Sequence, residues 1–205
     1  NRLASAPEAS NTNRSAELIL SLPMSDGTFQ DFSITSSTVM HPDLAAKYPQ
    51  IKTYSGQGIT DRTAMAKLDV TPFGFHAMIL SSGGTTYIDP FSLEDQDYYM
   101  VYHKRDFMTN KDFTCFVSGD GVTVEMDRII SQSPGVAKSV GSELKTYRLA
   151  LAATGEYTAF FGGTVPNALA AMVTSVNRVT GVYEREFAIR MVLIANTDTL
   201  IYTNA

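Results

Sequence analysis

Apolar and polar positions alternate along much of the first half of the chain, which is the pattern of half-buried β-strands. Residues 17–22 have leucines at every second position, 18, 20 and 22, and a Ser-Asp-Gly turn leads into a second alternating run at 29–34. Asp-Gly between two such runs is a hairpin signal. The same pattern predicts further strands at residues 64–71, 74–81, 85–89 and 98–103. Five or six antiparallel strands joined by short turns predict a twisted sheet, a sandwich or an open barrel.

The pattern changes in the last third of the chain. Residues 146–154 alternate and predict a strand, and Gly162-Gly163 then breaks the chain. Thr164 can cap a helix whose first turn holds Pro166, and we expect that helix to run through 168–183. Residues 187–195 form a nearly continuous apolar run, which predicts a central strand covered on both faces. The expected buried stripe of the helix is Val165, Leu169, Met172, Val173, Val176, Val179 and Tyr183.

These patterns divide the chain into four parts and predict an α+β fold. The parts are a flexible leader at 1–15, a β-rich domain at 16–125, a Ser-, Gly- and Pro-containing linker at 126–143, and a strand-helix-strand (βαβ) unit at 144–205. The leader suits what remains after a signal segment is removed. A unit of this size buries little surface, so we expect more chain or a partner chain to complete it.

Composition excludes some classes of function. Of the 205 residues, 44% are hydrophobic and 18% are charged, which allows a sizeable core. The net charge of −5 and the absence of clustered Lys and Arg argue against nucleic-acid binding. No apolar run is long enough to predict a membrane span.

The usual catalytic motifs are absent from the 205 residues: there is no phosphate-binding loop, no G-x-S-x-G and no H-E-x-x-H. His41, His76 and His103 are scattered and suit ordinary cap and strand positions better than a zinc site, although a fold could gather them. We interpret Glu156 as a solvated loop residue. After it, Tyr157, Phe160 and Phe161 form either a binding lip or, as we favour, a hydrophobic clasp over the following helix.

Three stretches of the sequence resemble parts of a known protein family. TYRLALAATGEYTAFFGGTVPNALAAMVTSVNRVTGVYEREFAIRMVLIAN (146–196) resembles the opening of the catalytic domain of bacterial reprolysin-like (adamalysin-type) zinc metallopeptidases of the metzincin clan. HPDLAAKYPQIKTYSGQGI (41–59) and TPFGFHAMILSSGGTTYIDPF (71–91) resemble the pro-domain of the same proteins. The family's zinc motif, H-E-x-x-H-x-x-G-x-x-H, is expected beyond Ala205, so no zinc ligand or catalytic Glu transfers to this chain.

The resemblance implies a zymogen portion: a pro-domain that maintains latency and assists folding, an activation segment, and the first elements of a zinc metalloendopeptidase. Zinc is expected in the complete enzyme and not in this chain alone, which should be inactive. The implied partners are the rest of the catalytic domain, on the same or a second chain, and protein or peptide substrates. The implied location is secreted, cell-surface or periplasmic, in bacteria.

The only cysteine, Cys115, lies in the stretch KDFTCFV, about thirty residues before the strand at 146. In this clan a pro-segment thiolate can occupy the open zinc position, and the placement of Cys115 fits that role. The alternative is a buried thiol that packs with its Phe and Val neighbours. Activation would need a cut near 126–145, for which Arg128, Lys138 and Lys145 are candidate sites.

Two other functions stay open from the sequence. One is a non-enzymatic β-rich extracellular binding or adhesion module, which predicts that no longer polypeptide has peptidase activity. The other is an enzyme assembled from two chains, which predicts a second polypeptide in the purified protein.

Overall fold

The computed structural model describes residues 2–8, 18–108 and 143–204, and it confirms the α+β class. In chain order the strands and α-helices are β1 (Leu18–Pro23), β2 (Phe29–Ser36), α1 (Pro42–Lys47), β3 (Lys52–Gly58), β4 (Met65–Thr71), β5 (Gly74–Ser81), β6 (Gly84–Pro90), β7 (Tyr99–His103), β8 (Lys145–Leu149), α3 (Gly155–Phe160), α4 (Val165–Phe187) and β9 (Ile189–Leu193). Short 3₁₀ turns are η1 (Arg2–Ser5), η3 (Lys104–Asp106) and η4 (Thr197–Leu200). Among the described helices, none has the length and apolarity needed to cross a bilayer.

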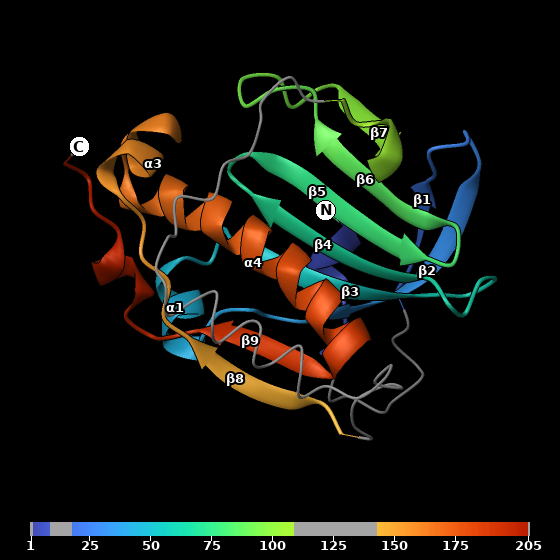
Figure 1. Cartoon of the computed structure of the whole chain (residues 1–205), viewed down its shortest axis with the longest axis horizontal. Helices are drawn as coiled ribbons and strands as arrows, with labels where there is room; N and C mark the ends of the chain where they lie inside the picture. Colours follow the sequence, from blue (N-terminus) through green and yellow to red (C-terminus); the bar gives the residue numbers. More distant parts are fainter. Residues whose placement is uncertain (1, 9–17, 109–142, 205) are drawn as a thin grey trace, which may run out of the picture.

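The first seven strands form one curled antiparallel sheet in the order β1 to β7, so each strand pairs with the next along the chain (Figure 1). The predicted hairpin is confirmed: Gly27 has φ +83° in the turn between β1 and β2, and Asp26 accepts from the backbone N–H of Thr28. One face of this sheet encloses an apolar core. Its buried members are Leu3, Leu22, Phe32, Ile34, Tyr54, Ala64, Ala66, Leu68, Ala77, Ile79 and Ile88.

The sequence pattern missed β3, which carries two glycines in KTYSGQG. A Cβ built on Gly56 would lie only 2.8 Å from Cδ1 of Ile34 on the neighbouring strand. Gly56 therefore allows β2 and β3 to approach closely under the buried Ile34 side chain. Gly56 is therefore required by packing within the sheet.

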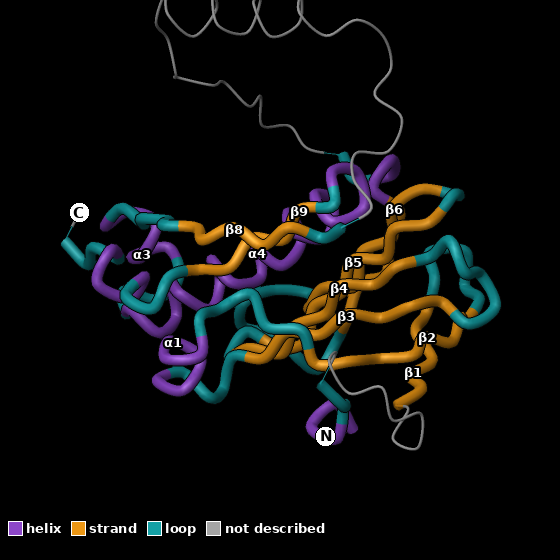
Figure 2. The backbone as a smooth tube through the Cα atoms, turned by 90° about the horizontal axis from the view of Figure 1, so that it is seen from below, coloured by secondary structure: helices purple, strands orange, loops and turns teal. Residues whose placement is uncertain are grey.

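The last third of the chain forms the predicted strand-helix-strand unit, with shifted bounds. β8 and β9 pair in parallel, and α4 connects them (Figure 2). The first strand ends at Leu149, five residues early, because Thr154 caps the short helix α3, which the sequence pattern did not predict. The long helix continues to Phe187, and Ala188, in the left-handed conformation at φ 53°, ends it before β9.

The edge of β9 is covered from the first part of the chain. The backbone N–H of Leu193 donates to the carbonyl of Val39 at 2.8 Å, and the N–H of His41 donates to the carbonyl of Leu193 at 2.9 Å. Met40 thus forms a parallel bridge with Leu193. The segment before α1 therefore pairs with the end of β9 through an isolated bridge, on the side of β9 away from β8.

A second apolar core joins the two parts of the chain. From the first part it takes Val39, Met40, Leu44 and Ile51; from the last part it takes Ala153, Ala168, Leu169, Ala170, Met172, Val173, Val176, Leu193 and Ile201. Helix α4 contacts β9 on one side and β4 on the other, so it runs between the two sheets (Figure 1).

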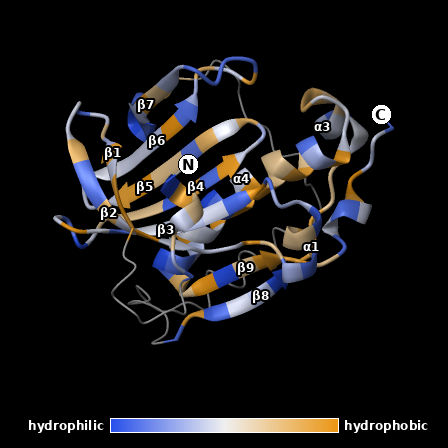
Figure 3. Cartoon of the chain, turned by 180° about the vertical axis from the view of Figure 1, so that it is seen from behind, coloured by the Kyte–Doolittle hydropathy of each residue, from blue (hydrophilic) through white to orange (hydrophobic). Residues whose placement is uncertain are grey.

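The buried stripe of α4 differs from the predicted one after Val176. Val179 and Tyr183 are 46% and 39% exposed, whereas Asn177, Thr180 and Gly181 are buried. The second half of the helix packs on a face of the large sheet that carries polar side chains. Figure 3 shows that β9, on the other side of the helix, holds both hydrophilic and hydrophobic residues. Apolar periodicity identified the helix, but it assigned the wrong face to its C-terminal half.

Candidate functional site at the junction of the sheet and helix α4

The face of the sheet that meets α4 carries charged side chains. Lys67 and Asp69 stand two residues apart on β4 and therefore point to the same face. Asp69 lies opposite His76 on β5, and the register of β5 with β6 places Asp89 one strand further on. Lys67 and Asp69 are each only 1% exposed. Buried charges need partners, and α4 supplies them.

Lys67 is held by a carboxylate of α4. Its Nζ lies 2.6 Å from Oε2 of Glu184 and donates to Oγ of Ser55 at 2.8 Å. The second oxygen of Glu184 accepts from Nε of Arg190 on β9 at 2.6 Å. Burial lowers the pKa of Lys67, and the charge of Glu184 opposes that shift. One carboxylate therefore ties β4, α4 and β9 together.

Asp69 forms a second polar centre. Its Oδ2 accepts from Oγ1 of Thr174 at 2.7 Å and lies 3.0 Å from Nδ1 of His76. Asn177, one helical turn on, donates to the carbonyl of Leu68 at 3.0 Å and lies 3.5 Å from Oδ1 of Asp69. Both partners on α4 are polar residues, and Asn177 belongs to the part of the helix where the buried face differs from the predicted one.

Asp89 forms the third centre with Arg178 of α4. The two side chains form an ion pair, and the hydroxyl of Tyr102 donates to the other oxygen of Asp89 at 2.8 Å. The guanidinium of Arg178 lies 5.0 Å from the ring centroid of Tyr87. Burial and the hydrogen bond to Asp89 raise the pKa of Tyr102. Asp89 of β6 thus binds α4 through a charge opposite in sign to that of Lys67, and Tyr102 of β7 donates a hydrogen bond to the same carboxylate.

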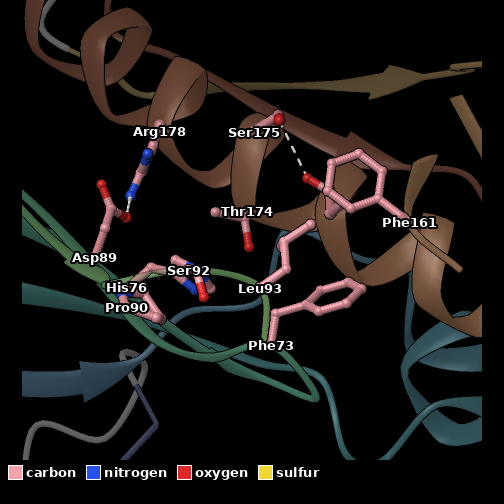
Figure 4. A pocket seen from close by; sticks show the side chains of 11 residues that line it. Phe73, His76, Asp89, Pro90, Ser92, Leu93, Phe161, Thr174, Ser175 and Arg178 are labelled. Atoms are coloured by element: carbon pink, nitrogen blue, oxygen red, sulfur yellow. Dashed lines mark hydrogen bonds and ion pairs between the residues drawn. The ribbon is translucent and has the colours of Figure 1, made fainter. Parts of the chain in front are cut away.

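A pocket of about 330 Å³ opens beside this junction (Figure 4). Side chains from both parts of the chain line it: Phe73, His76, Asp89, Pro90, Ser92, Leu93, Phe161, Ala171, Thr174, Ser175 and Arg178. The rings of Phe73 and Phe161 approach to 5.7 Å between centroids. Because Asp89 and Arg178 neutralise each other, the pocket has no uncompensated charge from this pair.

The aromatic stretch after Glu156 acts mainly as a clasp. Tyr157 packs against the core that joins the two parts, and the ring of Phe161 contacts Tyr157 and Phe73. Phe160 is 71% exposed. Glu156 lies in the first turn of α3 rather than in a loop, and hydrogen bonds from its own backbone and from Thr154 lower its pKa.

The described residues do not fit a zinc ion. His41 caps α1, His76 pairs with Asp69, and His103 caps η3. Within residues 2–8, 18–108 and 143–204, no group of three or more His, Cys, Asp or Glu side chains could hold a metal. The structure therefore supplies no zinc ligand set, and no catalytic step follows from these residues.

The other predicted site residues remain predictions. Cys115, Arg128 and Lys138 lie outside the described residues. Lys145 opens β8 as an exposed residue, and its backbone N–H donates to the carbonyl of Ala188 at 2.8 Å. A cut at Lys145 would fall in a paired strand, which is a less accessible place than an unpaired one.

Sequence reasoning missed the junction. In the run AMAKLDV, the alternation assigns Lys67 and Asp69 to a solvent-facing side of the strand. The strand sequence does not indicate that a helix about a hundred residues further along the chain packs on that side. A usable signal did exist on the helix side. Asn177, Thr180 and Gly181 form a polar and small stripe at helical spacing. Such a stripe is compatible with close packing on a polar surface.

Comparison with known proteins finds a family match for the last third of the chain. Residues 143–205 match the family model described as Metallo-peptidase family M12B Reprolysin-like. The matched residues, called the reprolysin-like region below, make up less than half of the chain. No curated protein and no solved structure matches the chain. The matched region contains β8, α3, α4 and β9, so the helix that carries Arg178 and Glu184 is its central element. The match confirms the resemblance for this region and relates the chain to metallopeptidases, whose reprolysin-like family depends on zinc.

Proposed function

We propose that this chain is the N-terminal portion of a secreted, bacterial zinc-dependent metalloendopeptidase precursor. Residues 16–125 are its pro-domain, which assists folding and maintains latency. The observation that carries the proposal is the junction: the reprolysin-like helix α4 is held by a buried and a partly buried ion pair from an upstream sheet. The family match favours this function over a non-enzymatic adhesion module.

The contacts explain how the pro-domain assists folding. A parallel strand pair with one helix buries too little surface to be stable alone. Here its core is completed by Val39, Met40, Leu44 and Ile51, and its outer strand is paired by the backbone at 39–41. The upstream domain thus supplies both apolar surface and hydrogen-bond partners to the reprolysin-like region.

The proposal requires a zinc motif outside residues 1–205. Its test is the coding sequence after Ala205, followed by purification of the longer polypeptide and measurement of zinc content and peptide hydrolysis. We expect an H-E-x-x-H, bound zinc, and hydrolysis that rises once the polypeptide has been cut in the 126–143 segment and the pro-domain has been removed. The matched control replaces the Glu of that motif by Gln and should stay inactive after the same cut. Lack of the motif, or of metal-dependent hydrolysis, would contradict the proposal.

Latency through Cys115 is a separate part of the proposal. A thiolate in the open zinc position displaces the catalytic water, so Cys115→Ala should raise hydrolysis by the uncut polypeptide. Cys115→Ser tests whether a weaker oxygen ligand preserves part of the effect. Unchanged latency in both variants would remove the switch and leave the pro-domain role intact.

A further inference from the structure

We propose that the α4-facing side of β4–β6 is a docking surface that needs no covalent connection to its helix. Residues 18–108 then stay bound to residues 143–204 after the chain between them is cut. The regulatory meaning rests on the proposed function, because it applies to a precursor that is activated by cleavage. The binding itself rests only on the junction.

The docking surface is shaped without its partner. All buried members of the core inside the large sheet lie between Leu3 and Ile88, and the seven strands are consecutive in the chain. None of these residues belongs to the reprolysin-like region. The positions of Lys67, Asp69 and Asp89 are therefore fixed by the sheet itself, which lowers the ordering cost of binding α4.

The charges of the surface select one register of the helix. Lys67 meets Glu184, whereas Asp89 meets Arg178, so the two ends of the contact have opposite polarity. Reversing the helix, or sliding it so that Arg178 met Lys67, would bring like charges together. Such mispairings are strongly disfavoured when the groups are buried. Gly181 adds a steric requirement, because only a residue without a side chain fits above Lys67.

Apolar and backbone contacts supply the rest of the interface. Leu44 and Ile51 share a core with Leu169, Val173 and Leu193. At the rim, Nζ of Lys47 lies 3.0 Å from Oδ2 of Asp198. Stable interfaces combine such an apolar centre with a polar rim. Together with the two backbone hydrogen bonds to Leu193, these contacts hold the parts together independently of the connecting chain.

This arrangement makes cleavage and release two separate events. Cutting the connecting chain leaves the paired charges in place, and salt screens buried pairs only weakly. A cut precursor would therefore keep its pro-domain until the junction itself is disrupted.

The test cuts the full chain and asks whether its parts separate. A recognition sequence for a site-specific protease is placed between Arg128 and Lys138, and the cut protein is passed over a size-exclusion column at low and at high salt. We expect both fragments to co-elute under both conditions. Separation of the wild-type fragments would overturn the proposal, whether or not a longer polypeptide has peptidase activity. Conversely, a complex that stays intact in a protein without such activity would contradict only the proposed function.

Charge variants test whether the junction is the cause. Arg178→Asp places two carboxylates together at Asp89 and should weaken binding between the cut fragments at least about tenfold. Arg185→Asp is the matched control, because Arg185 lies on the same helix and, among the described residues, forms its ion pair with the neighbouring Glu186 at 3.6 Å. The double variant Asp89→Arg with Arg178→Asp should recover much of the affinity. Equal effects of the two single variants would contradict the assigned surface; if Arg178→Asp does not fold before the cut, Lys67→Met gives a second, uncharged perturbation.

Discussion

Gly181 of α4 lies directly against Lys67 of β4. A Cβ built on Gly181 would lie 2.7 Å from Cγ of Lys67 and 3.0 Å from Cε of Met78. Overpacking a buried site costs about 1–3 kcal/mol for small insertions. We expect Gly181→Leu to lower the free energy of unfolding by about 3 kcal/mol, measured by urea denaturation, even though Leu favours helices more than Gly does.

The control for this prediction is Val179→Leu on the exposed side of the same helix. Val179 is 46% exposed, so a larger side chain there should change stability by no more than about 0.5 kcal/mol. If both variants had the same stability, α4 would not lie against β4 at Gly181.

Removing the partner of Lys67 should be costly at neutral pH. Glu184→Gln leaves the buried ammonium of Lys67 without its counter-charge, which typically lowers stability by about 3 kcal/mol. Burial already lowers the pKa of Lys67, and loss of Glu184 lowers it further. Below the ordinary lysine value of about 10.4, the unfolded chain then binds more protons than the folded protein, so stability rises with pH. The loss should shrink between about pH 7 and about pH 9.5 in denaturant titrations.

The double variant Lys67→Met with Glu184→Gln lacks the group that titrates. It should be more stable than Glu184→Gln alone at neutral pH and should show no comparable gain at alkaline pH. A pH-independent deficit in Glu184→Gln would mean that the charge of Lys67 is not the cause.

Tyr102 predicts the opposite pH dependence, in which the free energy of unfolding falls as pH rises. Burial and the hydrogen bond to Asp89 raise its pKa, so the folded protein binds more protons than the unfolded chain above about pH 10. Stability from this group is present below that pH and is lost as pH rises. Tyr102→Phe should cost about 1 kcal/mol at neutral pH and make the alkaline decline shallower. Tyr98→Phe, at a side chain that is 72% exposed, should change neither quantity.

The backbone pairing of residues 39–41 with Leu193 predicts slow amide exchange. The N–H groups of Leu193 and His41 donate across the two parts of the chain at 2.8 and 2.9 Å. By NMR, we expect both amides to exchange at least about 100-fold more slowly than that of Asp26 in the exposed turn, which corresponds to an opening free energy near 2.7 kcal/mol. Exchange at the rate of Asp26 would show that β9 has no partner on this side.

Local features of the fold were predictable because they depend on neighbours in the sequence. The alternation that buries Phe32 and Ile34, the turn at Asp26-Gly27 and the cap at Thr164 all follow from short patterns. Strand β3 was missed because Gly56 is required by the side chain of Ile34, which lies about twenty residues earlier. The residues around Gly56 in the sequence do not indicate the contact with Ile34.

The junction was missed because its strand half resembles a solvated surface and the apolar periodicity of the helix pointed to another face. Lys67 and Asp69 alternate with apolar residues, as on any half-exposed strand. Val179 and Tyr183 continue the apolar stripe in the sequence but are exposed in the structure. The charged face of the sheet is contacted by Asn177 and Glu184 instead. The decisive information is which strand face meets which helix face, and this is a property of the assembled chain.

Because strands β1 to β7 are consecutive in the chain, the whole large sheet is synthesised before α4. The ribosome completes β7 at His103 well before it reaches the end of α4 at Phe187. At about 5–20 residues per second, that interval lasts roughly 4 to 17 s. Small β-rich domains fold within about milliseconds to seconds. The nascent sheet therefore has time to form first, and α4 is made in the presence of the surface that receives it.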